Sequence, residues 1–364
     1  MKKKKSFKSI FFKSNFKFYK ERNYKNNAFF IDRERLDSTI TNSLTALAIS
    51  RKYRSNIIIL SDKSVDHLIT KFYKKLGFND FIFGINKFKY FSNLHISIFT
   101  SFICIKTILK TYFFGFSWFI KNFKIKNTLF GDLIYDTYIK FSNKYTNPQI
   151  DFDFLKFLFV GVFRALLINK YLLDNNISRI LSGTQNYSFN SGIALRIGVY
   201  KKIKNFYLHG TSIDKVEIKN HTIDEIYHGS YNISYGTCAK NFKKFNPPQK
   251  KINNFLKQRK KLSGINYYTG RDFYRANSKN KSFEFLRKLQ KTDKKIILFA
   301  CHALSDAAHG GGINYCFDNY FQQLDETLKI VNKYNKDNIW LIRPHPSSKD
   351  SHEKKIIKKL LRNY

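Results

Sequence analysis

Hydrophobic positions follow two different periods along the first quarter of the chain. Short, continuous apolar runs at residues 28–31, 56–60 and 81–83 are typical of strands buried on both faces of a sheet. The segments between them, residues 39–53 and 61–76, repeat apolar side chains at helical spacing. The resulting βαβαβ pattern predicts a parallel sheet with right-handed crossovers, as in doubly wound α/β folds.

Cap residues predict where these two helices begin and end. Asp37 or Ser38 is expected to cap the first helix and a residue of 61–64 the second, because their side-chain oxygens can accept from free backbone N–H groups. Gly77 is expected to end the second helix, since glycine adopts the left-handed conformation without steric cost.

The alternation of strands and helices stops after Gly84 and resumes near residue 154. Residues 85–150 are aromatic, basic and mostly helical in pattern, so we expect an insertion that presents Phe and Lys to a membrane or to an acceptor. Within it, the mainly apolar run at 94–105 is too short for a membrane span and predicts a core or interfacial helix. The later elements are expected as helices at 154–175 and 189–198 and strands at 178–182 and 205–209.

A second βαβ pattern lies near the end of the chain, with a strand at 295–300, a helix at 317–334 and a strand at 339–343. A basic stretch with the Pro247-Pro248 pair precedes it and is typical of a linker. We therefore expect a basic and aromatic N-terminal segment at 1–27, a Rossmann-like domain at 28–230, a linker at 231–290 and a partial second Rossmann-like domain at 291–364.

The charge of the chain limits the classes of partner that it is expected to bind. With 66 Lys and Arg against 26 Asp and Glu, the 364 residues carry a formal net charge of +40, while 43% hydrophobic residues argue against a disordered polycation. Such a surface attracts nucleotide phosphates, other polyanions or an anionic membrane. Codon bias in an AT-rich genome is the alternative explanation. Residues 1–27 are expected to lie on anionic lipid or to form a solvated, frayed terminus.

The cysteines and the first residues of the chain indicate in which cellular compartment the protein is expected. Cys104, Cys238, Cys301 and Cys316 form no CxxC pair, which favours neither a disulfide framework nor a zinc site, so a reducing cytoplasm is expected. The basic start lacks an apolar core and a cleavage site, so we expect no secretory signal. Nucleic-acid binding is disfavoured because the sequence has no RRM, KH, zinc or helix-turn-helix signature.

Three sets of polar residues at strand ends predict chemistry, because ligands of parallel sheets bind at the carboxyl ends of strands. The first is the RPHP run at 343–346, followed by Ser347 and Ser348. Its two prolines fix the backbone, so Arg343, His345 and the two hydroxyls are predicted to grip a phosphate or pyrophosphate. A tight turn with a buried, hydrogen-bonded His345 is the alternative.

The second strand end is the loop after Ala300, which contains His302, Ser305, Asp306, His309 and Gly310-Gly311-Gly312. The glycines allow a donor phosphate to approach backbone N–H groups in front of the next helix. Asp306 with His309 is predicted to act as a general base toward a sugar hydroxyl. A merely flexible loop is the alternative, since the sequence has no Walker lysine motif and no GxGxxG fingerprint.

The third set of residues comes from two strand ends of the first domain. It consists of Gly183, Thr184, Gln185, Asn186 and Tyr187 after strand 178–182, and of His209, Gly210 and Thr211 after strand 205–209. Small and amide residues beside a tyrosine suit hydrogen bonding and stacking with a sugar, which predicts an acceptor or cleft site at Gln185, Asn186, Tyr187 and His209. Helix capping by Gln185 and Asn186 is the alternative.

Three strings of residues carry a resemblance to a known family. LFACHALSDAAH at 298–309 and WLIRPHPSS at 340–348 resemble the carboxyl-terminal domain of bacterial capsule polysaccharide biosynthesis proteins, which are glycosyltransferase-like enzymes with the GT-B fold. The RPHP element is also similar to polysialyltransferase and glycerophosphotransferase relatives. The run SGTQNYSFNSGIALRIGVYKKIKNFYL at 182–208 is similar to that family's strand, helix and strand leading to the interdomain cleft.

The resemblance implies an α/β protein of the GT-B type, with two Rossmann-like domains and a second domain that is incomplete in this chain. It implies a transferase on the cytoplasmic, inner face of the cell membrane that moves a sugar from a nucleotide-sugar donor to a glycan or lipid-linked acceptor of capsule or lipopolysaccharide. The nucleotide sugar is then a substrate, with no cofactor and no metal. Arg343 and His345 would hold the donor phosphates, with Asp306 and His309 as base candidates.

One departure from the family pattern affects this expectation. Only 70 residues follow Lys294, whereas a complete GT-B second domain needs roughly 150. The chain is therefore expected to be a fragment or a degenerate homologue, with an apolar sheet edge left open. Two other functions stay open: a non-catalytic basic protein that docks on anionic membrane or polysaccharide, and a CDP-glycerol-type glycerophosphotransferase.

Overall fold

The computed structural model describes residues 24–31, 36–61, 66–78, 80–83, 93–183, 187, 190–208, 215–218, 249, 253, 289, 291–309, 317–335, 338–345 and 352–364. The chain divides into two compact units. Unit 1 comprises Met1–Asn232 and Ala307–Asn319, and unit 2 comprises Ile233–Asp306 and Tyr320–Tyr364. Most of the expected segment 1–27 and nearly all of the expected linker 231–290 lie outside the described residues.

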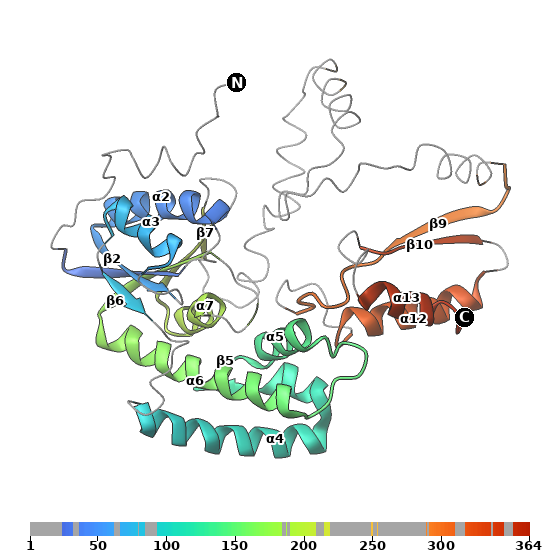
Figure 1. The fold of residues 1–364 in the computed structure, drawn as a ribbon, viewed down its shortest axis with the longest axis horizontal. Coiled ribbons are helices and arrows are strands. Elements are labelled where there is room, and N and C mark those ends of the chain that lie inside the picture. The colour runs from blue at the N-terminus through green and yellow to red at the C-terminus, as the bar shows by residue number, and fades with distance from the viewer. Residues whose placement is uncertain are drawn as a thin grey trace. The chain divides into compact units, whose positions relative to one another are not determined.

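A six-stranded sheet forms the centre of unit 1 in the described part of the chain (Figure 1). Its order is β3-β2-β1-β6-β7-β8, and all neighbouring strands are parallel except β7 and β8. Numbered along the chain, the five parallel strands follow the order 3-2-1-4-5 of Rossmann-like folds. The predicted α/β class with a parallel sheet is therefore confirmed. The bounds are β1 Asn26–Ile31, β2 Ser55–Ser61, β3 Phe81–Phe83, β6 Ile177–Ser182, β7 Lys204–Leu208 and β8 Lys215–Ile218.

The core of this sheet is made by the apolar runs that predicted the strands. Phe30 of β1, Ile59 of β2 and Leu181 of β6 are buried together in one hydrophobic cluster, which Phe72 and Leu76 of α3 (Leu68–Leu76) join. Burial of such side chains is the main favourable term in folding, so these runs contribute much of the stability of the sheet.

Helices cover both faces of the sheet. In Figure 1, α2 (Leu36–Tyr53) and α3 lie on one face, and α7 (Asn190–Tyr200) lies on the other. The expected cap of α2 was wrong: the helix begins at Leu36, so Asp37 and Ser38 lie inside it.

The expected N-cap of α3 was also wrong, whereas its end is confirmed. The residue before the helix is His67, whose Nδ1 accepts from the backbone N–H of Ile69 at 3.2 Å. Any acceptor at this place satisfies a free N–H, so an imidazole serves as well as a hydroxyl. Gly77 ends α3 in the left-handed conformation at φ 99°, as predicted.

The segment predicted as an insertion forms α4 (Leu94–Asn122), a short antiparallel hairpin of β4 (Lys124–Ile125) and β5 (Thr128–Leu129), and α5 (Gly131–Ser142). The helix predicted at 154–175 follows as α6 (Phe152–Asp174). Helices α4, α5 and α6 pack pairwise, and α6 also packs against α7. In Figure 1, α4 and α6 run side by side.

Helix α4 is longer than the apolar run at 94–105 that predicted it. The helix continues through the lysines that interrupt the apolar run and reaches 29 residues, so that its length and composition match those of a membrane-crossing helix. Only 28% of its most apolar window is buried inside the protein. The backbone at Gly115 leaves helical geometry, with φ 77° and ψ 173°.

Unit 2 contains the second βαβ pattern in its described part. Strands β9 (Lys295–Ala300) and β10 (Asn338–Arg343) pair in parallel and are connected through α12 (Tyr320–Lys333), while α13 (His352–Leu360) follows near the end. The register places Ala300 beside Arg343, so the two predicted loops start at the same edge of the strand pair.

Candidate functional site

The strand order of unit 1 places a topological switch point between β1 and β6, where the connections leave in opposite directions. Gly183 closes this edge, because its N–H donates to the carbonyl oxygen of Ile31 at 2.8 Å. Tyr187 follows with a left-handed backbone at φ 70°, and its hydroxyl accepts from the N–H of Ala307 at 3.2 Å. Of the predicted acceptor residues, Tyr187 therefore lies in the loop leaving the switch point, while Gln185, Asn186 and His209 lie outside the described residues.

A buried carboxylate–guanidinium pair was not predicted from the sequence. Asp132 in the first turn of α5 and Arg196 of α7 are both buried, and their Oδ2 and Nη2 atoms are 2.6 Å apart. The second guanidinium nitrogen reaches Asp132 Oδ1 at 3.2 Å and the carbonyl oxygen of Leu129 at 3.0 Å. This bidentate geometry compensates the desolvation of both charges.

His309, predicted as a catalytic base, is held by a second carboxylate of the same helix. Its Nδ1 lies 2.8 Å from Asp136 Oδ1, and its backbone N–H donates to Asp136 Oδ2 at 3.0 Å. Both side chains are 2% exposed. The rings of Tyr135 and His309 meet in an edge-to-face arrangement, and Asn319 donates to the Tyr135 hydroxyl at 3.4 Å.

Two opposing effects set the pKa of His309. Burial acts to lower the pKa, whereas the Asp136 charge and its hydrogen bond raise it, with further raising by Asp132 and Asp318, and the net pKa lies above the usual value of histidine. An imidazole oriented by a carboxylate through one ring nitrogen is the arrangement that general-base catalysis uses. The same arrangement also stabilises a core, because it satisfies two buried polar groups at once.

Unit 2 brings together the two predicted strand ends. The imidazole of His302, after β9, stacks on Tyr320 with ring centroids 4.2 Å apart and an interplanar angle of 12°. The imidazole of His345, after β10, stacks on that of His302 with ring centroids 5.7 Å apart. Arg343 ends β10 with an exposed side chain, and its carbonyl oxygen accepts from the N–H of Cys301 at 2.8 Å. Two stacked imidazoles thus lie at the edge of the strand pair where Arg343 ends β10.

The remaining polar residues of this loop have partners inside unit 2. Ser305 donates to the carboxylate of Glu353 through its N–H at 3.0 Å and its hydroxyl at 2.7 Å. Asp306, the other predicted base, has a side chain that is 40% exposed and lies 4.0 Å from His302 Nδ1. The predicted phosphate contacts Gly310, Gly311, Ser347 and Ser348 lie outside the described residues.

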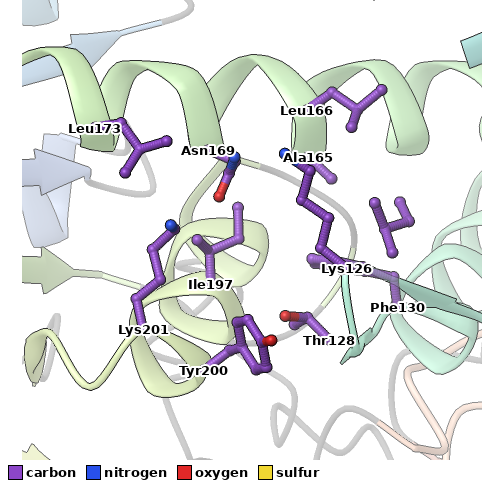
Figure 2. Close-up of a pocket in the computed structure, with 11 residues that line it drawn as sticks. Lys126, Thr128, Phe130, Ala165, Leu166, Asn169, Leu173, Ile197, Tyr200 and Lys201 are labelled. Atoms are coloured by element: carbon purple, nitrogen blue, oxygen red, sulfur yellow. The ribbon is translucent and has the colours of Figure 1, made fainter. Parts of the chain in front are cut away.

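Unit 1 also contains a hollow that no sequence pattern indicated. Figure 2 shows Lys126, Thr128 and Tyr200 facing Asn169 across it. Its empty space of about 440 Å³ includes open solvent, so the hollow does not by itself identify a substrate site. It is lined by Ile125, Lys126, Thr128, Phe130, Ala165, Leu166, Asn169, Leu173, Ile197, Tyr200 and Lys201.

No cluster of three or more His, Cys, Asp or Glu with metal-binding geometry occurs among the described residues. Comparisons with models of protein families, with curated proteins and with solved structures find no match. The residues themselves therefore carry the functional argument.

Proposed function

We propose that this chain is a glycosyltransferase that moves a sugar from a nucleotide-sugar donor to an acceptor of surface-polysaccharide assembly, capsule or lipopolysaccharide. The observation that carries the proposal is the gathering of His302, His345 and Arg343 at the carboxyl ends of β9 and β10. This is the edge at which parallel α/β sheets bind their ligands. The Rossmann-like order of the unit 1 sheet supports the same class of protein.

In this proposal, Arg343, His302 and His345 form the site that binds the donor diphosphate. Breaking the bond between the sugar and the diphosphate leaves negative charge on the phosphate oxygens. The exposed guanidinium of Arg343 supplies a fixed positive charge with fork geometry, and His345 adds a donor whose ring is held in place by His302. Stacking of His302 on Tyr320 limits the movement of both imidazoles, so the charge is stabilised with little reorganisation.

The acceptor hydroxyl needs a base as it attacks the sugar carbon. Asp306 offers a carboxylate that solvent reaches, close to His302 in the same loop. His309 offers an imidazole oriented by Asp136, but it is buried. Asp306 is therefore the better placed proton acceptor in this proposal, and the His309–Asp136 pair has a positioning role.

Thermal unfolding of the full chain with UDP, GDP, CDP and UDP-glucose tests the phosphate grip. A ligand at a hundred times its Kd stabilises by about 2.7 kcal/mol, which raises the Tm by several degrees. Arg343→Ala and His345→Gln should abolish the shift, whereas Arg362→Ala, an exposed arginine of the last turn after α13, should retain it. Equal shifts in Arg343→Ala and the wild type would rule out the assignment, as would the absence of a shift with every nucleotide.

CDP-glycerol serves as a second probe in the same experiment. It shares the diphosphate but carries glycerol phosphate in place of a sugar. If CDP-glycerol stabilises the chain and nucleotide sugars do not, the reaction is glycerophosphate transfer and the sugar-transfer proposal fails. If nucleotide sugars stabilise the chain more strongly, the proposal is supported.

A further inference from the structure

Helix α4 carries a continuous apolar stripe on its outer face. Leu94, Ile98, Phe102, Leu109 and Phe113 recur at spacings of four and seven residues and fall on one side of the helix. Phe102 is 66% exposed, Leu109 is 54% exposed and Phe113 is 75% exposed. At 1.5 Å per residue, the stripe is about 30 Å long, which is far more than scattered surface leucines produce.

The opposite face of α4 is the one that packs inside the protein. Thr100, Cys104, Thr107 and Thr111 are buried there, and α4 packs against α5 and α6. The threonine hydroxyls donate back to carbonyl oxygens of their own helix, at 2.7 Å from Thr100 to Ile96 and at 2.8 Å from Thr111 to Thr107. Between Thr100 and Thr111, the buried face thus consists of small side chains, while the large apolar side chains of the stripe face outward.

Basic residues border this stripe. Lys106 and Lys110 are exposed beside it, and Lys121, Lys124 and Lys126 are exposed beyond its end. The sequence contains no acidic residue between Asp80 and Asp132. An apolar face with aromatic rings and a wholly basic border complements anionic lipid, because rings and alkyl chains enter the leaflet while ammonium groups meet the headgroups.

We propose that the outer face of α4 docks the chain on an anionic phospholipid bilayer, with the helix lying in the plane of one leaflet. A transmembrane orientation is disfavoured because α5 and α6 pack along α4 and would enter the bilayer with it. Those helices contain Asp132, Asp136 and Arg164, and ionisable groups inside a bilayer are costly. Docking of α4 is independent of sugar transfer, since it concerns a different surface.

Co-sedimentation of the full chain with vesicles of phosphatidylglycerol and phosphatidylcholine in equal parts tests the docking face. The double variant Phe102→Ser/Leu109→Ser should lose at least about tenfold in partitioning, because two exposed apolar side chains no longer enter the leaflet. The control is Ile330→Ser/Tyr334→Ser, which replaces two similarly exposed side chains of unit 2 and should partition like the wild type. Retained partitioning of the α4 variant would overturn the proposal.

Two further measurements distinguish other occupants and orientations. Pure phosphatidylcholine vesicles should bind the wild type more weakly, and an alkaline carbonate wash should release it, as expected for a helix in the plane of the leaflet. Resistance to the wash would indicate a spanning helix and contradict the proposed orientation. Light scattering measures self-association. If the wild type self-associates without binding vesicles, and Phe102→Ser/Leu109→Ser does not self-associate, the occupant of the stripe is a second copy of the chain. The nucleotide-dependent Tm of the same variant should match the wild type, so that a failure of docking and a failure of sugar transfer can be told apart.

Discussion

Helices α4 and α5 are packing neighbours in unit 1, but α5 buries charged side chains and α4 exposes apolar ones. Helix α5 buries the carboxylates of Asp132 and Asp136, whereas α4 exposes an apolar stripe that includes Phe102. The charges of α5 are balanced inside the fold by Arg196 and His309. Among the described residues, the stripe of α4 is exposed, and an exposed apolar surface of this size is typical of a binding surface.

Removing the partner of a buried α5 carboxylate should give the largest loss in the free energy of unfolding. Replacing Arg196 by Met leaves the buried Asp132 charge without its guanidinium, and we expect a loss of about 3–5 kcal/mol in the free energy of unfolding. Urea denaturation measures it, with Arg362→Met as the matched surface control, expected to change stability by less than about 0.5 kcal/mol.

A second change sharpens the same prediction. Adding Asp132→Asn to Arg196→Met removes the stranded charge, so part of the lost stability should return. If Arg196→Met unfolds at the urea concentration of the wild type, the buried pair makes no net contribution and the contrast between α4 and α5 loses its basis.

The junction between the two helices should be the next most sensitive place. A methyl group at Gly131, where α5 begins, would collide with the backbone carbonyl oxygen of Phe119 at the end of α4. Gly131→Ala should therefore cost about 1–3 kcal/mol in urea denaturation. Gly115→Ala is the comparison, because that position has open space and only a positive φ, and it should cost about 1 kcal/mol. Equal costs would mean that the close approach at Gly131 relaxes without penalty.

The His309–Asp136 pair should make stability depend on pH. Because the pKa of His309 is raised in the folded state, its contribution is fully present below the unfolded pKa of about 6.5 and is lost as pH rises through the folded pKa. The Tm difference between wild type and His309→Gln should therefore be largest in mildly acidic buffer and shrink toward alkaline pH. A difference that grows with pH would contradict a protonated His309 in the folded protein.

The smallest effect on stability is expected on the outer face of α4. Phe102 and Leu109 are more than half exposed, so the double serine variant should change the free energy of unfolding by no more than about 0.5 kcal/mol per site. The large effect of this variant is expected in vesicle binding. A loss of several kcal/mol in urea denaturation would show that the stripe is covered in solution by another part of the protein.

Much of the fold was predictable because its signals are local. The apolar runs at 28–31, 56–60 and 81–83 gave β1, β2 and β3 within two residues at each end, since a buried strand needs little more than continuous apolar side chains. The N-cap of α3 was not predictable, because several residue types satisfy a free N–H, whereas Gly77 at its end was. The full length of α4 was missed because lysines at Lys106 and Lys110 interrupt its hydrophobic run without interrupting the helix.

The candidate sites were predictable only in part. The strand ends carrying His302 and His345 were identified from sequence, and the pairing of β9 with β10 brings them together. Asp132, Asp136 and Arg196 were missed, although two aspartates four residues apart are conspicuous in a chain this poor in acids. Their partners are 64 and 173 residues away, and no local pattern specifies such pairs.

The sequence by itself determined the alternation of strands and helices, the excess of positive charge and the residues that end each strand, because these depend on side chains close along the chain. The tertiary structure alone decided that α5 holds buried charges and that α4 turns its apolar face outward. Those outcomes depend on which distant side chains meet, since a buried carboxylate is stable only beside its partner and an apolar stripe is recognised as exposed only when the neighbours of the helix are known.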